Sequence, residues 1–135
     1  MRWTVLSVGR LRAPYADDIE HYRGLLRRYA TVDLVEVRED AQLPRRIPDR
    51  AFVSLLDDRG EAMDSVAFSR WVQARREAAV DVCFVIGGAY GLDLPEADHR
   101  LSLGPLTMPH QLARVVLLEQ LYRAHRILAG EPYHH

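Results

Sequence analysis

Residues able to do chemistry are concentrated in the last third of the 135-residue chain. Five of the six histidines lie between His99 and His135, and four arginines stand against two glutamates after residue 98. Imidazole exchanges protons near neutral pH, and the arginine fork binds anions. We therefore expect an anionic partner or substrate to meet this end of the chain.

A glycine turn follows one of the apolar runs. VCFVI leads into Gly87 and Gly88 of the segment IGGAYGL. Glycines at the end of a buried strand allow the backbone to approach a ligand closely. The segment is not GxGxxG and no Walker lysine follows, so neither common phosphate-binding motif applies. A tight turn without a ligand is the alternative.

A second loop, LGPLTMPH at residues 103–110, combines a glycine and two prolines in an apolar segment. Pro109 suits the first turn of a helix, and Thr107 is placed to cap that helix. A rigid apolar loop with free amides and carbonyls also suits an adenine ring. A capped helix entry alone would produce the same pattern, so both interpretations stay open.

Other chemistries find less support. The final EPYHH is open to interpretation as a loose tail, a pH-sensitive site or a tag remnant. A zinc site needs about four ligands at a known spacing, and the histidines at 110, 125, 134 and 135 do not provide it, so we expect no metal. The serines at 54, 65, 69 and 102 lack the glycines of a nucleophile elbow, and Cys83 lies mid-strand.

The elements that must position these residues alternate along the chain. Strands are predicted at 3–9, 32–37, 51–60 and 81–86, and amphipathic helices at 15–30 and 64–79. A proline-broken loop is expected at 39–50, a helical turn at 94–100, a short strand from 101 and a long helix after Met108. The apolar face of that helix is too broad for a one-sided surface helix, so it is central or lies at a dimer interface. The pattern predicts one α/β domain over residues 1–135, with a mostly parallel sheet and flanking helices.

Composition narrows the setting. The net charge is −1, and all 18 cationic side chains are arginines, so the overall basic character usual for nucleic-acid binding is missing. No apolar run approaches the ~20 residues of a membrane span. The single Cys83 excludes an internal disulfide and suits a reducing compartment. We expect a cytoplasmic protein.

FVIGGAYGL followed by LSLGPLTMPHQLARVVLLEQLYRAHRILAGEPYHH resembles the RlmH family of SPOUT-class methyltransferases. WTVLSVGRL and LLDDRG match this family more loosely. The resemblance implies a C-terminal trefoil knot, an obligate homodimer and S-adenosylmethionine as the methyl donor. It also implies methylation of ring nitrogen N3 of a pseudouridine in large-subunit (23S) ribosomal RNA, on assembled ribosomes.

Carried over position by position, the resemblance implies three groups of site residues. Cofactor binding falls to Leu56, Gly87, Gly88, Gly104, Pro105, Leu106, Thr107, Met108 and Pro109. Substrate binding falls to His110, Arg114 and His135. The third group, Tyr133 and His134 of the PYH tail, lies on the substrate side. From the chemistry of N3 methylation we expect catalysis by His134, Tyr133 and Arg123: either His134 takes the N3 proton, or Arg123 or Arg114 stabilises the anion, or positioning alone suffices.

The chain departs from the family pattern at three places. His135 stands where arginine is usual, Tyr90 stands where many members have an acid, and the segment after Glu36 is short where a basic loop and a helix are common. The altered tail and the short segment motivate an alternative, a catalytically weak or inactive ribosome- or RNA-binding module that retains the cofactor fold. A nucleotide-binding α/β protein of unrelated function is the further alternative, and a monomer in solution would favour it.

Overall fold

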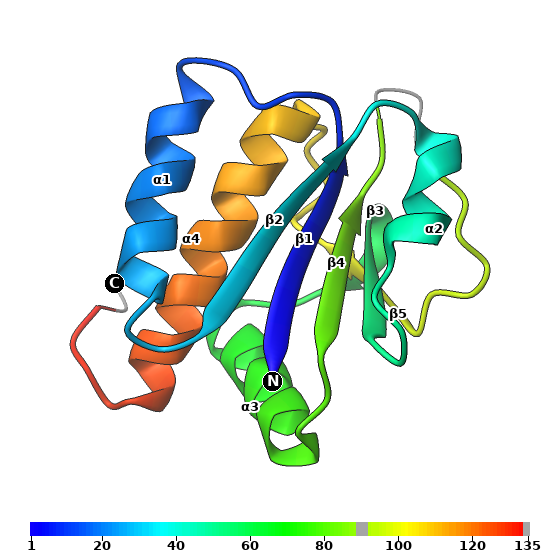
Figure 1. Cartoon of the computed structure of the whole chain (residues 1–135). Helices are drawn as coiled ribbons and strands as arrows, with labels where there is room; N and C mark the ends of the chain where they lie inside the picture. The colour runs from blue at the N-terminus through cyan, green and yellow to red at the C-terminus, as the bar shows by residue number, and fades with distance from the viewer. Residues whose placement is uncertain (89–91, 134–135) are drawn as a thin grey trace.

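Five parallel strands form the centre of the molecule (Figure 1). The computed structural model describes residues 1–88 and 92–133, so Tyr90, His134 and His135 lie outside the described residues. The strands are β1 (Arg2–Val8), β2 (Thr31–Val37), β3 (Phe52–Ala62), β4 (Val82–Ile86) and β5 (His99–Ser102). They lie in the order β2-β1-β4-β3-β5, and every neighbouring pair is parallel. The predicted α/β class with a parallel sheet is confirmed.

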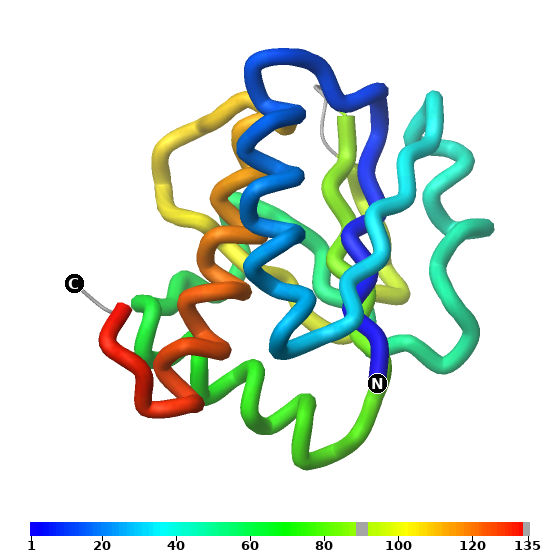
Figure 2. The backbone as a smooth tube through the Cα atoms, turned by 60° about the vertical axis from the view of Figure 1, so that its left-hand side comes forward, coloured from blue at the N-terminus to red at the C-terminus, as the bar shows by residue number. Residues whose placement is uncertain are grey.

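Both faces of this sheet are buried, which explains the nearly continuous apolar strands. On one face, Trp3, Val5 and Phe84 join the core formed with α1 (Tyr15–Leu26), α3 (Ser65–Ala78) and α4 (His110–Leu128). On the other face, Leu6 and Cys83 pack under η1 (Asp40–Gln42) and α2 (Leu43–Arg46). Figure 2 shows α1 and α4 side by side on their face and the η1–α2 segment on the opposite one.

The last helix is the central one of its layer. It packs against both α1 and α3, and Leu117, Leu118 and Leu121 are fully buried. This position explains much of its broad apolar face. The predicted cap is wrong, because Pro109 is the N-cap residue and no side chain caps the helix. By contrast, α3 begins with the Asp64 carboxylate accepting the Ala67 amide at 2.8 Å.

Three boundaries differ from the sequence prediction. The first helix ends at Leu26, because the amides of Tyr29 and Ala30 both bond to the Leu26 carbonyl and turn the chain into β2. The expected loop at 39–50 contains η1 and α2, whose Leu43 is completely buried against the sheet. The helical turn expected at 94–100 is confined to residues 94–97, where the Ala97 amide bonds to the Leu94 carbonyl at 3.0 Å, since His99 and Arg100 already pair with β3 as part of β5.

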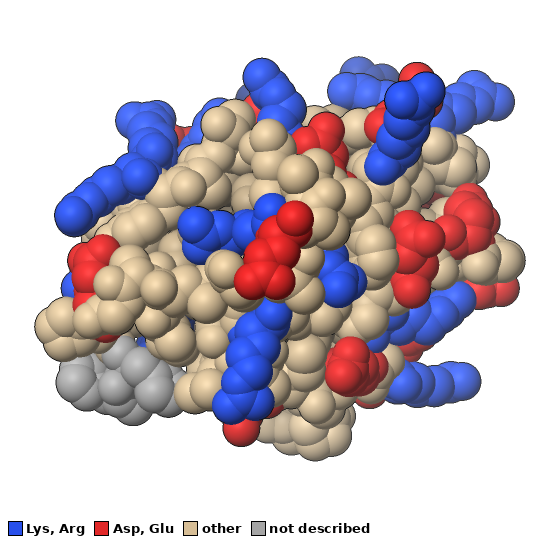
Figure 3. Space-filling model, turned by 90° about the horizontal axis from the view of Figure 1, so that it is seen from below, with Lys and Arg blue, Asp and Glu red and all other residues tan. Residues whose placement is uncertain are grey.

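The surface carries both signs of charge. The face seen from below in Figure 3 has arginines and acidic residues side by side, without a large region of one sign. Among the helices of the described residues, none is long and apolar enough to cross a membrane.

Candidate functional site

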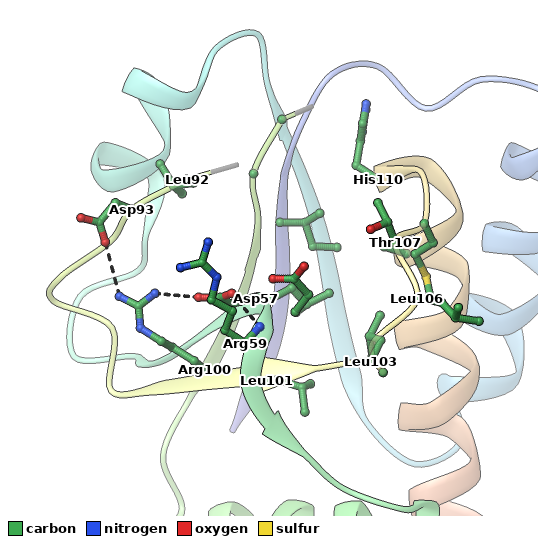
Figure 4. Close-up of a pocket in the computed structure, with 18 residues that line it drawn as sticks. Asp57, Arg59, Leu92, Asp93, Arg100, Leu101, Leu103, Leu106, Thr107 and His110 are labelled. Carbon is green, nitrogen blue, oxygen red and sulfur yellow. Dashed lines mark hydrogen bonds and ion pairs between the residues drawn. The ribbon is translucent and has the colours of Figure 1, made fainter. Parts of the chain in front are cut away.

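A pocket with a volume of about 690 Å³ opens at the carboxyl ends of β3 and β4 (Figure 4). Crevices at this edge of parallel sheets commonly bind ligands, and the volume is in the range of small-molecule sites. Its walls come from the end of β3, the glycine turn after β4, β5 with the loop behind it, and the first turn of α4. The lining residues are Leu56, Asp57, Asp58, Arg59, Ile86, Gly87, Gly88, Leu92, Asp93, Arg100, Leu101, Leu103, Gly104, Leu106, Thr107, Met108, His110 and Ala113.

A bulge in β3 supplies the charged wall of this pocket. Leu101 of β5 pairs first with Leu56 and then with Glu61, so residues 57–60 loop out of the ladder. Gly60 is required there, because a Cβ atom would lie 2.6 Å from the backbone carbon and oxygen of Arg100. The bulge brings Asp57 and Arg59 to the pocket.

Arg100 joins two sides of the pocket. Its Nη1 lies 3.0 Å from Asp57 Oδ2, and its Nη2 lies 3.5 Å from Asp93 Oδ1 and 3.4 Å from the Leu94 carbonyl. Figure 4 shows this bridge between the β3 bulge and the segment after the glycine turn. The pKa of Asp57 is lowered, first by the hydrogen bond from the Arg59 amide and then by Arg100. The Asp57 carboxylate is therefore ionised at neutral pH.

Gly87 is required by packing, whereas Gly88 contributes its backbone amide. A Cβ atom at Gly87 would lie 2.7 Å from the Cβ of Leu92. The Gly88 amide donates to Asp40 Oδ1 at 2.8 Å, which fastens the turn to η1. Asp40 was not found from the sequence, because its segment was interpreted as a loop.

His110 stands at the pocket wall with an unusual imidazole. Its Nδ1 is buried and has no hydrogen-bond partner among the described residues. Burial lowers the pKa of His110, and the nearby charges of Arg114 and Arg12 lower it further, while Asp40 opposes them. The ring is therefore neutral at pH 7.

Arg114 lies inside the molecule and does not line the pocket. It is 4% exposed, its Nη2 donates to the carbonyls of Val8 and Gly9, and its Nη1 is 3.2 Å from Glu36 Oε2. Burial lowers the pKa of Arg114, and the bond to Glu36 opposes this shift. The guanidinium thus binds the backbone at the carboxyl end of β1, whereas contact with substrate was expected from the sequence.

Arg123 and Tyr133 lie toward the other end of α4. Arg123 Nε donates to Glu119 Oε1 at 2.8 Å, and its guanidinium carbon is 4.8 Å from the Tyr133 ring centre. The bond to Glu119 raises the pKa of Arg123. At ~1.5 Å per residue, about 20 Å of helix separates Arg123 from His110. Within one chain these residues do not meet the pocket.

The pocket brings together seven of the nine residues expected at the cofactor, all but Pro105 and Pro109, and adds His110 from the substrate group. Sequence reasoning missed Asp57, Arg59 and Arg100. Three charged residues, Asp57, Asp58 and Arg59, directly follow the strand FVSLL and were a usable signal for the first two of the missed residues. Arg100 had none, because only the pairing of β5 with β3 brings it there.

Comparisons with known proteins identify the family. A family profile described as predicted SPOUT methyltransferase matches residues 1–134. The chain belongs to the SPOUT methyltransferase family. It is 44% identical to the ribosomal RNA large subunit methyltransferase H of Gemmatimonas aurantiaca over 153 aligned residues, covering 99% of each chain. The protein of the same name from Gluconacetobacter diazotrophicus is 45% identical over 96% of this chain and 95% of its own length. The one from Pelobacter propionicus is 41% identical over 100% of both chains.

The family relationship gives the pocket its chemical context. Methyltransferases of this family need a donor site. Within residues 1–88 and 92–133, no group of three or more His, Cys, Asp or Glu side chains is placed to hold a metal ion. The 153 aligned positions exceed the 135 residues of this chain, so the first relative contains segments that this chain lacks.

Proposed function

We propose that this chain transfers a methyl group from S-adenosylmethionine to ring nitrogen N3 of a pseudouridine in large-subunit ribosomal RNA, on assembled ribosomes and as a homodimer. The observation that carries the proposal is the pocket itself. Segments far apart in the sequence converge there in a chain whose full-length relatives are named ribosomal RNA large subunit methyltransferase H.

The residues of the pocket fit this donor. Gly104, with φ +122° and open space where a Cβ would lie, leaves the backbone of the 103–108 loop accessible to an adenine ring. The opposite wall has three carboxylates, Asp57, Asp58 and Asp93, against two guanidinium groups, Arg59 and Arg100. An excess of negative charge favours a cationic ligand. When bound, S-adenosylmethionine supplies a methyl group activated by a positively charged sulfur.

The distance along α4 supports a second copy. Arg123, on whose guanidinium Tyr133 packs, is about 20 Å of helix away from His110, so a site that uses Arg123 and the pocket must combine two chains. Two large apolar side chains beside the pocket, Leu106 at 80% and Leu112 at 36% exposure, are the kind of surface that another subunit covers. In the homodimer that we propose, the tail of one chain reaches the pocket of the other. The trefoil knot implied by the resemblance belongs to the same proposal.

Proton transfer and anion stabilisation are the tasks left for side chains. Methylation of N3 forms a nitrogen–carbon bond, breaks the sulfur–carbon bond and releases the N3 proton. We assign proton acceptance to His134. Arg123 stays cationic beside Glu119 and suits stabilisation of the pyrimidine anion, with Tyr133 packed on its guanidinium. Arg114 does not stabilise this anion, because its guanidinium already binds the Gly9 carbonyl and the Glu36 carboxylate inside the molecule.

The test is methyl transfer from labelled S-adenosylmethionine to ribosomes that lack the modification. Wild type should label a pseudouridine, and His134→Ala should lose most of this activity while binding the donor as before in calorimetry. His21→Ala, an exposed histidine on α1, is the matched control and should be fully active.

Two other outcomes would change the assignment. Full activity of His134→Ala would move the chemistry to Arg123 or to positioning alone. Tight donor binding by wild type without any methyl transfer would support the alternative of an RNA-binding module that retains the cofactor fold.

A further inference from the structure

The loop between β1 and α1 is held by a buried amide of α4. Gln111 is 6% exposed; its Nε2 donates to the Arg10 carbonyl at 2.8 Å, and its Oε1 accepts the Arg12 amide at 3.1 Å. Figures 1 and 2 show this loop beside the first turn of α4. One side chain thus determines the path of the backbone on both sides of Leu11.

The buried guanidinium of Arg114 and its half-exposed partner Glu36 also hold this loop. Arg114 donates to the Gly9 carbonyl at 2.9 Å, and its partner Glu36 also accepts the Leu11 amide. The Gly9 amide donates to the Val37 carbonyl at 2.8 Å. Burying a guanidinium is costly unless all its partners are in place. These contacts fix the first four residues of the loop, Gly9–Arg12.

The fixed backbone presents two unpaired cations. The side chains of Arg10 and Arg12 are exposed, and within residues 1–88 and 92–133 no carboxylate oxygen lies within 4 Å of either guanidinium. Arg12 is close enough to lower the pKa of His110, which lines the pocket. The position where a Gly9 Cβ would lie is 3.5 Å from the same His110 ring. The loop therefore borders the pocket.

We infer that Gly9–Arg12 is a preorganised contact for RNA phosphates beside the target nucleotide. Arg10 and Arg12 bind the phosphates, and Gln111 is the positioning residue that holds them at a fixed distance from the pocket. The chain has a net charge of −1, so it has no general attraction for RNA, and a few fixed arginines must supply it. The inference rests on the proposed function and extends it to the substrate-side surface.

The test compares three variants for binding to unmodified ribosomes at several salt concentrations. Arg10→Ala/Arg12→Ala removes the two cations. Arg27→Ala/Arg28→Ala removes two exposed arginines at the other end of α1 and is the charge-matched control. Gln111→Leu keeps every arginine but releases the loop, and thermal unfolding of each variant checks its fold.

Each lost phosphate contact should reduce the slope of log K against log salt by roughly 0.7–0.9. For Arg10→Ala/Arg12→Ala this corresponds to a loss of roughly 15- to 30-fold in ribosome affinity at 0.15 M salt, relative to the 1 M extrapolation. KM for ribosomes should rise with little change in kcat, and donor affinity should stay unchanged. The control pair should bind as wild type, and folded Gln111→Leu should lose affinity without a change in charge.

Three results would overturn the inference. The first is an unchanged slope of log K against log salt for Arg10→Ala/Arg12→Ala while wild type is an active methyltransferase. The second is an equal loss of ribosome affinity in Arg27→Ala/Arg28→Ala. The third is loss of the dimer in the double variant, which would make the loop a subunit contact. A wild type that binds ribosomes but transfers no methyl group would instead refute the proposed function and leave the loop contact standing.

Discussion

Arg114 gives the sharpest test of how the structure is held around the site. Arg114→Met removes the guanidinium but keeps a long apolar stem. It leaves the carbonyls of Val8 and Gly9 without their donor and Glu36 without its cation. Each buried acceptor left unpaired costs about 1–3 kcal/mol. The pair with Glu36 adds little, since that carboxylate is 42% exposed.

Methionine avoids the cost of burying a charge, which offsets part of this loss. We expect a net decrease of about 2–3 kcal/mol in the free energy of unfolding. For a chain of this size that corresponds to a fall in Tm of roughly 8–12 °C. The measurement is thermal and urea unfolding at one fixed protein concentration. Glu36→Gln, which keeps the bonds of Arg114 to the backbone, is the control and should cost less than about 1 kcal/mol.

The refuting result is specific. If Arg114→Met unfolds at the wild-type temperature and loses only ribosome binding, the guanidinium acts on substrate as the sequence indicated. The structural role in β1 would then be wrong. A large loss of stability in Glu36→Gln would also contradict the reasoning, because it would place most of the energy in the partly exposed pair.

Contacts and buried groups elsewhere in the protein give four further expectations. Arg100→Ala should raise the calorimetric Kd for S-adenosylmethionine several-fold, and Arg100→Lys should restore only part of the affinity, since lysine does not span the carboxylates of Asp57 and Asp93. Wild-type affinity in both variants would contradict a role for this bridge in the pocket. Gly60→Ala should lower Tm by several degrees because its Cβ meets the β5 backbone at 2.6 Å, and an unchanged Tm would show that the bulge yields. Burial raises the pKa of Cys83 to about 12, so a thiol reagent at pH 8 should label only the unfolded chain, and rapid labelling of the native protein would count against it. Burial lowers the pKa of His125, so protonation of this imidazole favours unfolding, and the stability that the neutral ring contributes is complete above about pH 6.5 and falls at lower pH. His125→Asn should therefore flatten the decline of Tm between pH 7 and pH 5, and an unchanged slope would contradict this assignment.

Local sequence was sufficient for the class of fold and for the parts of the site that are continuous in the chain. Strands buried on both faces become continuous apolar runs, and helices between them show a three- to four-residue period, so the alternation is visible without a structure. The glycine turn and the 103–108 loop were found in the same way. Each carries its own signal, because glycine and proline restrict or free the backbone locally.

Contacts between distant segments were decided by the tertiary structure alone. Arg100 and Asp57 are 43 residues apart, and they meet only because β5 pairs with β3 at the edge of the sheet. Arg114 has the same residue type and helix as Arg123, yet one is turned inward to β1 and the other lies at the surface with Glu119. No local pattern distinguishes them, because the strand order determines which side chains meet. The type of each element is a property of its own residues, whereas the partner of each charge is a property of the packed sheet.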